Sequence, residues 1–95
     1  MDDVLKLMGL IYRAHKMIFG EELIKNIKNV KLLFLASDIS DKSRARYEKK
    51  CHFYNIDIID IYSSEQLSDS IGKQNIKALG ITDKGFKETI LKKIK

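Results

Sequence analysis

The chain has 95 residues, of which 44% are hydrophobic, and a formal net charge of +5 at pH 7. This length predicts one domain over residues 1–95, and the hydrophobic content fills one core without a metal or a disulfide, which excludes a disordered chain. The sequence has one cysteine, an acidic rather than basic start and no long apolar stretch. We therefore expect a reduced, cytoplasmic protein without a membrane span.

The N-terminal part predicts a helix, a strand and a second short helix. Apolar residues at positions 4, 7, 8, 11 and 12 share one helical face, with Asp3 as the expected cap and an end near His15. The apolar run at 17–19 is typical of a short edge strand, and Gly20 closes it because glycine adopts the positive φ of a turn. A brief helix is expected from there to Asn29.

The rest of the chain alternates strands with helices. Near-continuous apolar runs at 31–36, 56–61 and 76–81 predict strands that are buried on both faces. The last helix is expected to bury Phe86, Ile90, Leu91 and Ile94. This order predicts an α/β fold, a three-layer α/β/α sandwich. The expected helix caps are Ser40 or Asp41, Ser63 with Gln66 in a capping box, and Asp83.

The basic residues are concentrated in two places, at 42–50 and in the C-terminal helix. Fifteen of the eighteen are lysines, which suit phosphate contact better than bidentate reading of bases. The C-terminal group suits the negative end of a helix dipole. For the 42–50 cluster two interpretations stay open, a solvated helix face or, as the family resemblance described below implies, an auxiliary surface for RNA.

The sequence contains no arrangement of residues that indicates catalysis or cofactor binding. Cys51 and His52 are adjacent on a predicted helix, where side chains point about 100° apart, so we expect a buried thiol beside a surface imidazole. Asp38 and Asp41 are interpreted as a turn and a cap rather than as metal ligands, and no phosphate-binding glycine motif is present. The sequence thus predicts no enzyme, no metal, no cofactor and no small-molecule substrate.

Five segments in order, MGLIYRAHKMIFGEE, LFLASD, KKCHFYNIDI, QLSDSIGK and ITDKGF, cover about residues 5–94. They resemble the superfamily of ribosomal L-seven-Ae and L-thirty-e proteins, particularly its small bacterial YlxQ-like branch. The resemblance implies an α/β/α sandwich with a four-stranded mixed sheet. It also implies a protein that binds structured RNA, since the best-known members bind RNA kink-turns, and an association with ribosomal RNA.

In that superfamily a Gly-x-Asn-Glu-x-x-Lys motif after the first strand contacts guanine edges and phosphates beside sheared G·A pairs. Gly20 matches its glycine, and Glu22 with Lys25 keeps the Glu-x-x-Lys spacing if one residue is deleted after Gly20, which places Glu21 at the Asn position. Without the deletion, Leu23 would stand at the Glu position. The short connection that follows favours the deletion. A Glu in place of Asn removes donors, so phosphate contact is expected rather than guanine reading.

The resemblance implies further contacts outside this motif. Tyr62, in the loop after the third strand, is expected to stack on an extruded base, with packing on its own loop as the alternative. Lys73 after Gly72 is an expected phosphate contact, and Arg13 and Lys16 are the basic residues before the motif.

A second function class stays open beside RNA binding. Glu21 departs from the motif, and Ser68 replaces a family glycine. These departures are compatible with a protein-interaction module that kept the fold and lost specific RNA reading. In either case we expect a monomer.

Overall fold

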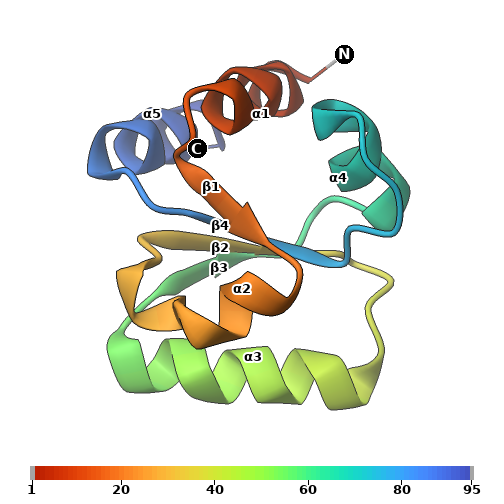
Figure 1. Cartoon of the computed structure of the whole chain (residues 1–95), viewed down its shortest axis with the longest axis vertical. Coiled ribbons are helices and arrows are strands. Elements are labelled where there is room, and N and C mark those ends of the chain that lie inside the picture. Colours follow the sequence, from red (N-terminus) through yellow and green to blue (C-terminus); the bar gives the residue numbers. More distant parts are fainter. Residues whose placement is uncertain (1, 95) are drawn as a thin grey trace.

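The computed structural model describes residues 2–94, and its helices and strands alternate along the chain (Figure 1). The five helices are α1 (Asp3–Arg13), α2 (Glu21–Lys25), α3 (Asp41–Tyr54), α4 (Ser64–Ile71) and α5 (Lys84–Ile94). A 3₁₀ turn, η1 (Ile27–Asn29), follows α2. The strands are β1 (Met17–Phe19), β2 (Leu32–Leu35), β3 (Asp57–Ile59) and β4 (Ala78–Ile81).

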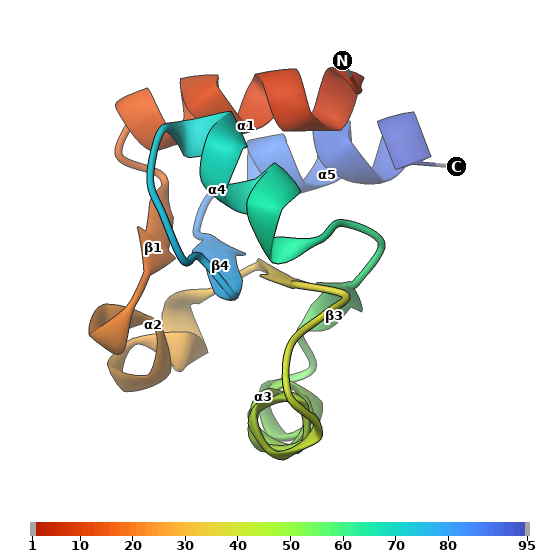
Figure 2. The same ribbon diagram turned by 90° about the vertical axis from the view of Figure 1, so that its right-hand side faces the viewer.

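The four strands form one mixed sheet in the order β1-β4-β2-β3. β4 runs antiparallel to both β1 and β2, whereas β2 and β3 are parallel. Helices α1, α4 and α5 cover one face of the sheet, and α2 and α3 cover the other (Figures 1 and 2). The predicted three-layer α/β/α sandwich with a four-stranded mixed sheet is therefore confirmed.

The core is divided by the sheet into two hydrophobic clusters. The larger lies under α1, α4 and α5 and includes Phe34 and Leu67, and the smaller lies under α2 and α3 and includes Leu23 and Cys51. β2 and β4 are buried at all four positions, as expected for strands covered on both faces. The same expectation is wrong for β3, where Asp57 is exposed, because β3 is an edge strand with β2 as its one neighbour.

The predicted helix caps are confirmed at three helices. Ser40 accepts a hydrogen bond from the Ser43 amide at 3.3 Å, and Asp83 accepts one from the Phe86 amide at 2.9 Å. Ser63 and Gln66 form the complete capping box of α4. Such caps satisfy amides that a helix leaves unpaired at its start.

Two expectations about helix ends and burial are wrong. The cap of α1 is Asp2 rather than Asp3, since the Asp2 carboxylate accepts from the amides of Val4 at 2.7 Å and Leu5 at 3.4 Å. In α5 Ile90 is buried and Phe86 and Leu91 are partly buried, whereas Ile94 is 37% exposed because it lines an open hollow with Lys93 and Ile61.

The centre of β4 explains how α2 and η1 approach the sheet. A Cβ added at Gly80 would lie 2.7 Å from Val30 Cγ2 and 2.9 Å from Leu23 Cδ1. No side chain fits there without displacement, so glycine at this position permits the close packing that holds α2 beside the end of β1.

Candidate nucleic-acid interface

One end of the sheet collects the loops that contain most of the predicted site residues. Phe19 at the end of β1 pairs with Leu79 near the start of β4, and Leu35 at the end of β2 pairs with Ala78. β3 ends at the same edge, since it is parallel to β2. Three segments therefore lie side by side at this end of the sheet: Gly20, residues 73–77 before β4 and the loop 60–63 after β3 (Figure 1).

A groove of about 550 Å³ lies between α2, α3 and the segment that leads into β4. We call it the α2–α3 groove. Three cations (Lys25, Arg46 and Lys77) and one carboxylate (Glu21) line it. A concave surface with excess positive charge concentrates its field and attracts anions. The other lining residues are Gly20, Ile24, Tyr47, Asn75, Ile76 and Ala78.

The side chains of α2 distinguish the two placements of the sequence motif. Gly20 has φ +70°, a value that glycine adopts without strain, and it starts the helix. Leu23 is fully buried, so the placement without a deletion puts a core side chain at the Glu position. Glu22 and Lys25 are both exposed, and the Glu22 carboxylate accepts from the Asn26 amide nitrogen at 3.2 Å. The placement with the deletion thus puts exposed side chains, Glu22 and Lys25, at the Glu and Lys positions of the motif.

Three more of the predicted residues gather on the other side of β1. Lys73 Nζ lies 5.6 Å from the centre of the Tyr12 ring, which itself contacts Phe19 at 5.9 Å between ring centres. Arg13 and Gly72 line a shallow hollow of about 410 Å³ with Tyr12. The segment 73–77 connects this group with the α2–α3 groove.

Lys16 is separate from both groups. It precedes β1, so it lies at the opposite end of that strand from Gly20, and its carbonyl accepts from the Thr82 amide at 2.9 Å. The structure does not bring Lys16 to the groove.

Tyr62 is in the core, and the expectation that it stacks on a base is wrong. Its side chain is 5% exposed and stacks on Phe34 with 6.1 Å between ring centres. Burial, together with the neighbouring Asp2 carboxylate, raises the pKa of Tyr62. The exposed apolar side chain of this loop is Ile61, at 59%.

Ser68 and Asp38 connect the loops at this end of the sheet through hydrogen bonds. The buried Ser68 hydroxyl donates to the Ser64 carbonyl at 2.6 Å and accepts from the Ile76 amide at 2.9 Å, which holds the segment 73–77 against α4. The Asp38 carboxylate accepts from the amide and hydroxyl of Ser64 at 2.8 and 2.9 Å. These bonds lower the pKa of Asp38 and join the loop after β2 to the start of α4.

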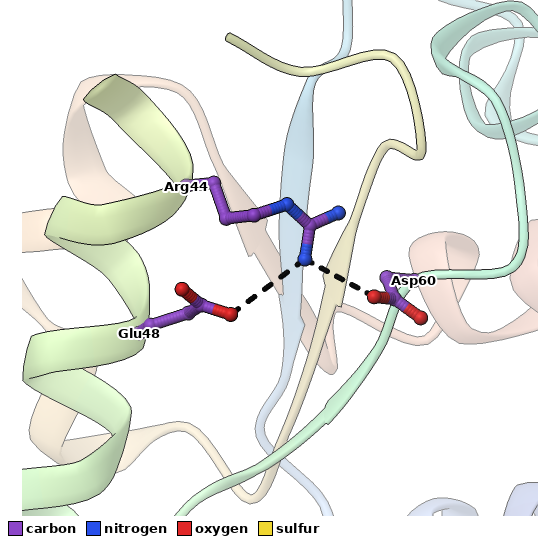
Figure 3. Close-up of polar contacts among 3 residues, drawn as sticks. All are labelled: Arg44, Glu48 and Asp60. Carbon is purple, nitrogen blue, oxygen red and sulfur yellow. Dashed lines mark hydrogen bonds and ion pairs between the residues drawn. The ribbon is translucent and has the colours of Figure 1, made fainter. Parts of the chain in front are cut away.

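The basic cluster at 42–50 divides between two flanks of α3. Arg44 Nη1 lies 3.1 Å from Asp60 Oδ2 and 3.7 Å from Glu48 Oε2, so two carboxylates neutralise it (Figure 3). Arg46 is two positions further along, about 200° around the helix, and lines the groove instead. The sequence analysis included Arg46 only as one member of the 42–50 cluster, although its helical phase relative to Arg44 separates the two.

The thiol of α3 is unsuited to nucleophilic chemistry. Cys51 is buried and His52 exposed, which confirms the sequence expectation. Burial raises the pKa of Cys51 to about 11, so the thiol stays protonated at neutral pH. Within residues 2–94 no three His, Cys, Asp or Glu side chains group to hold a metal ion. No helix in that range has the length and apolar character of a membrane span.

The sheet order and the loops at one edge define the class of protein. The chain superposes with a TM-score of 0.92 on a protein with unknown function from Bacillus halodurans, at 29% identity over 99% of this chain and 98% of that one. It superposes with a TM-score of 0.76 on the Giardia lamblia 15.5kD RNA binding protein, at 14% identity over 96% and 81% of the two chains. The fold is that of the L-seven-Ae and L-thirty-e superfamily.

Sequence relatives define the family within this class. The chain is 36% identical over 85 residues to the RNA-binding protein YlxQ of Enterococcus faecium, covering 86% of this chain and 82% of the relative. It is 35% identical over 88 residues to the protein of the same name from Bacillus subtilis, covering 90% and 88%. No protein-family model matches the chain. The chain belongs to the YlxQ family.

Proposed function

We propose that this protein binds structured RNA of the kink-turn type, in association with ribosomal RNA, and has no catalytic activity. Both curated relatives have the name RNA-binding protein YlxQ. The observation on which the proposal rests is the α2–α3 groove, which is lined by Lys25, Arg46 and Lys77. Three cations around a concave surface suit the phosphates of a bent RNA backbone.

Each part of the edge then has a distinct role in binding. The groove cations hold phosphates on one side of β1, while Arg13 and Lys73 hold them on the other. Glu21 and Glu22 accept hydrogen bonds from the amino groups of bases. Unlike the Asn of the family motif, the Glu21 carboxylate has no N–H group to donate to an acceptor atom of guanine. Ile61 covers an extruded base, the role that the buried Tyr62 cannot perform. Recognition depends on RNA shape with a few contacts to exposed base edges.

An alternative function is a protein-interaction module that kept the fold. The observation that favours it is Glu21, since a carboxylate inside the groove repels phosphate. This alternative predicts no preference among RNAs.

A titration with two RNAs tests the proposal against its alternative. One RNA contains a kink-turn, and in the other the sheared G·A pairs are replaced by Watson–Crick pairs. We expect at least tenfold tighter binding of the kink-turn. Equal affinity for the two contradicts kink-turn recognition, and no binding to either favours a protein partner.

Two measurements connect the affinity to the groove. Lys25→Ala should weaken the kink-turn complex more than Lys92→Ala, because Lys92 lies on the last turn of α5, away from the groove. If about four to six phosphates are neutralised, log affinity should fall against log salt with a slope of roughly −3 to −5. A flat salt response would contradict the proposal.

The proposal also includes the setting in which the protein acts. We propose that residues 1–95 form one domain that binds RNA as a cytoplasmic monomer, without a cofactor or a small-molecule substrate. Light scattering after gel filtration checks the monomer, at a mass near 11.0 kDa without RNA.

A further inference from the structure

The outer side of α3 combines cations with exposed aromatic rings. Arg46, Lys49, Lys50 and Phe53 follow the spacing i, i+3, i+4 and i+7, so they form one stripe along two turns. We call it the α3 stripe. Tyr47 and Cys51 are about a third of a turn or more away and pack toward the sheet. In Figure 2, which shows α3 end-on, the outer side of the helix faces away from the sheet.

The stripe borders an open hollow of about 610 Å³, lined also by His52 and Tyr54. Within residues 2–94, no carboxylate lines this hollow. Phe53 is 75% exposed, more than any other large hydrophobic side chain within residues 2–94, and its ring meets the Tyr54 ring edge-on at 4.9 Å. An exposed aromatic pair of this kind marks a binding surface rather than a part of the core.

The cations of the stripe are available to a ligand. On the other flank of α3, Glu48 and Asp60 neutralise Arg44 (Figure 3). Arg46, Lys49 and Lys50 form no ion pair with any side chain of residues 2–94. Positive charge interleaved with exposed aromatic rings is the combination that binds unpaired nucleotides, with phosphates on the cations and bases stacked on the rings.

The hollow and the α2–α3 groove meet at Arg46, which lines both. An RNA strand that leaves the groove past Arg46 therefore reaches Lys49 and Lys50 within one further helical turn and Phe53 within two. A second copy of this chain fits less well, since it would place like charges against each other.

We propose that the α3 stripe is a second RNA contact, which stacks an unpaired nucleotide on Phe53 and Tyr54 and holds its phosphates with Lys49 and Lys50. The inference rests on the proposed function, because it assumes that the RNA strand reaches the α3 stripe from the α2–α3 groove. An apolar, acidic protein segment is the competing occupant, and the choice of variants separates the two.

The experiment compares a blunt kink-turn RNA with the same RNA extended by six unpaired uridines, at the 5′ end and at the 3′ end in turn. Fluorescence anisotropy gives the dissociation constants. We expect one extension to tighten binding about tenfold, the size of one base–aromatic stack. Phe53→Tyr should keep this advantage, since it keeps the ring, and Phe53→Leu should remove it while leaving affinity for the blunt RNA unchanged.

A second variant and a matched control make the result specific. Replacing Lys49 and Lys50 together by Gln should reduce the salt slope for the extended RNA by about 1.4, two phosphate contacts on a single strand. Leu10→Ala removes another exposed apolar side chain, on α1, and should leave the advantage intact. Circular dichroism checks that every variant is folded, which is expected because these side chains are exposed.

The outcomes separate failure of this inference from failure of the proposed function. If the blunt kink-turn binds and neither extension adds affinity, the inference is overturned. It is also overturned if Phe53→Leu keeps the advantage, because an apolar side chain without a ring then suffices, as for a protein segment. A third outcome is that the kink-turn does not bind, while hexauridine alone binds and Phe53→Leu abolishes its binding. The proposed function is then wrong, and the α3 stripe is supported as a contact for unpaired RNA.

Discussion

The two faces of the sheet differ in how much they bury and in what they present to solvent. Within residues 2–94, sixteen buried residues form the cluster under α1, α4 and α5, and eight form the cluster under α2 and α3. The groove and the α3 stripe both belong to the second face. The larger part of the core therefore lies on one side of the sheet, whereas the groove and the α3 stripe lie on the other.

The sequences of two helices explain this division. α1 buries Val4, Leu5, Met8 and Ile11 in eleven residues, whereas α3 buries only Cys51 in fourteen. A helix that presents cations on most of its circumference has few positions left for the core. The face that carries the charge thus has the smaller cluster.

The largest expected effect is on the α1–α4–α5 side. Phe34→Ala removes a fully buried ring that stacks on Tyr62, and we expect a loss of about 3–5 kcal/mol of unfolding free energy, because the cavity cannot collapse. Urea denaturation followed by circular dichroism measures it. The matched control is Phe53→Ala on the α3 stripe, with an expected change below about 0.5 kcal/mol. Equal losses in the two variants would contradict the division between the faces.

The next effect is on the α2–α3 side, at Gly80. Gly80→Ala should cost about 1–3 kcal/mol, because the new methyl group would meet Val30 and Leu23 at less than 3 Å. In a Val30→Ala background the same substitution should cost less, since both Val30 methyl groups are gone and the contact with Leu23 alone remains. Thermal unfolding of the four proteins measures this coupling. If the losses of the two single variants simply add in the double variant, the contact between Val30 and residue 80 does not determine how α2 and η1 pack on β4.

Much of the fold could be predicted because its signals are local. Apolar runs identify β2 and β4, and the caps at Ser40, Ser63 and Asp83 act within three residues of their own position. The run at 56–61 resembles the other two in composition. Its edge position depends on which strands are its neighbours, which no local pattern contains.

The site was harder to predict because its residues meet through distant contacts. Tyr62 is buried by Phe34 and Asp2, the latter sixty positions away. Arg46 enters the groove because α3 packs beside the segment before β4. By contrast, Gly20, Glu21 and Lys25 are close in sequence, so their shared position beside the groove could be predicted from the motif alone.

The third prediction compares the two flanks of α3. Arg46→Ala should weaken RNA binding about tenfold at low salt and reduce the salt slope by about 1, with stability unchanged. Arg44→Ala should leave RNA affinity unchanged and cost at most about 1 kcal/mol, because its partners Glu48 and Asp60 are half exposed. Anisotropy titrations and urea denaturation of both variants check this. If Arg44→Ala weakens RNA binding as much as Arg46→Ala does, the two flanks of α3 do not differ in RNA contact and the prediction is wrong.

The smallest effect tests the loops that frame the groove. The pKa of Asp38 is lowered from its ordinary value of 3.8 by hydrogen bonds from the amide and hydroxyl of Ser64. A lowered pKa means that the ionised carboxylate stabilises the fold at pH values above 3.8, and that this contribution is lost as the pH falls from there through the pKa of the folded state. Asp38→Asn removes the charge, so the stability of the variant should fall less than that of the wild type over this interval. Thermal unfolding at pH 7 and at a series of values below 4 measures this difference between the variant and the wild type. Parallel curves for wild type and Asp38→Asn would show that Asp38 does not hold the loop after β2 to α4, and the stability of that edge would then depend on Ser68 and Ile76.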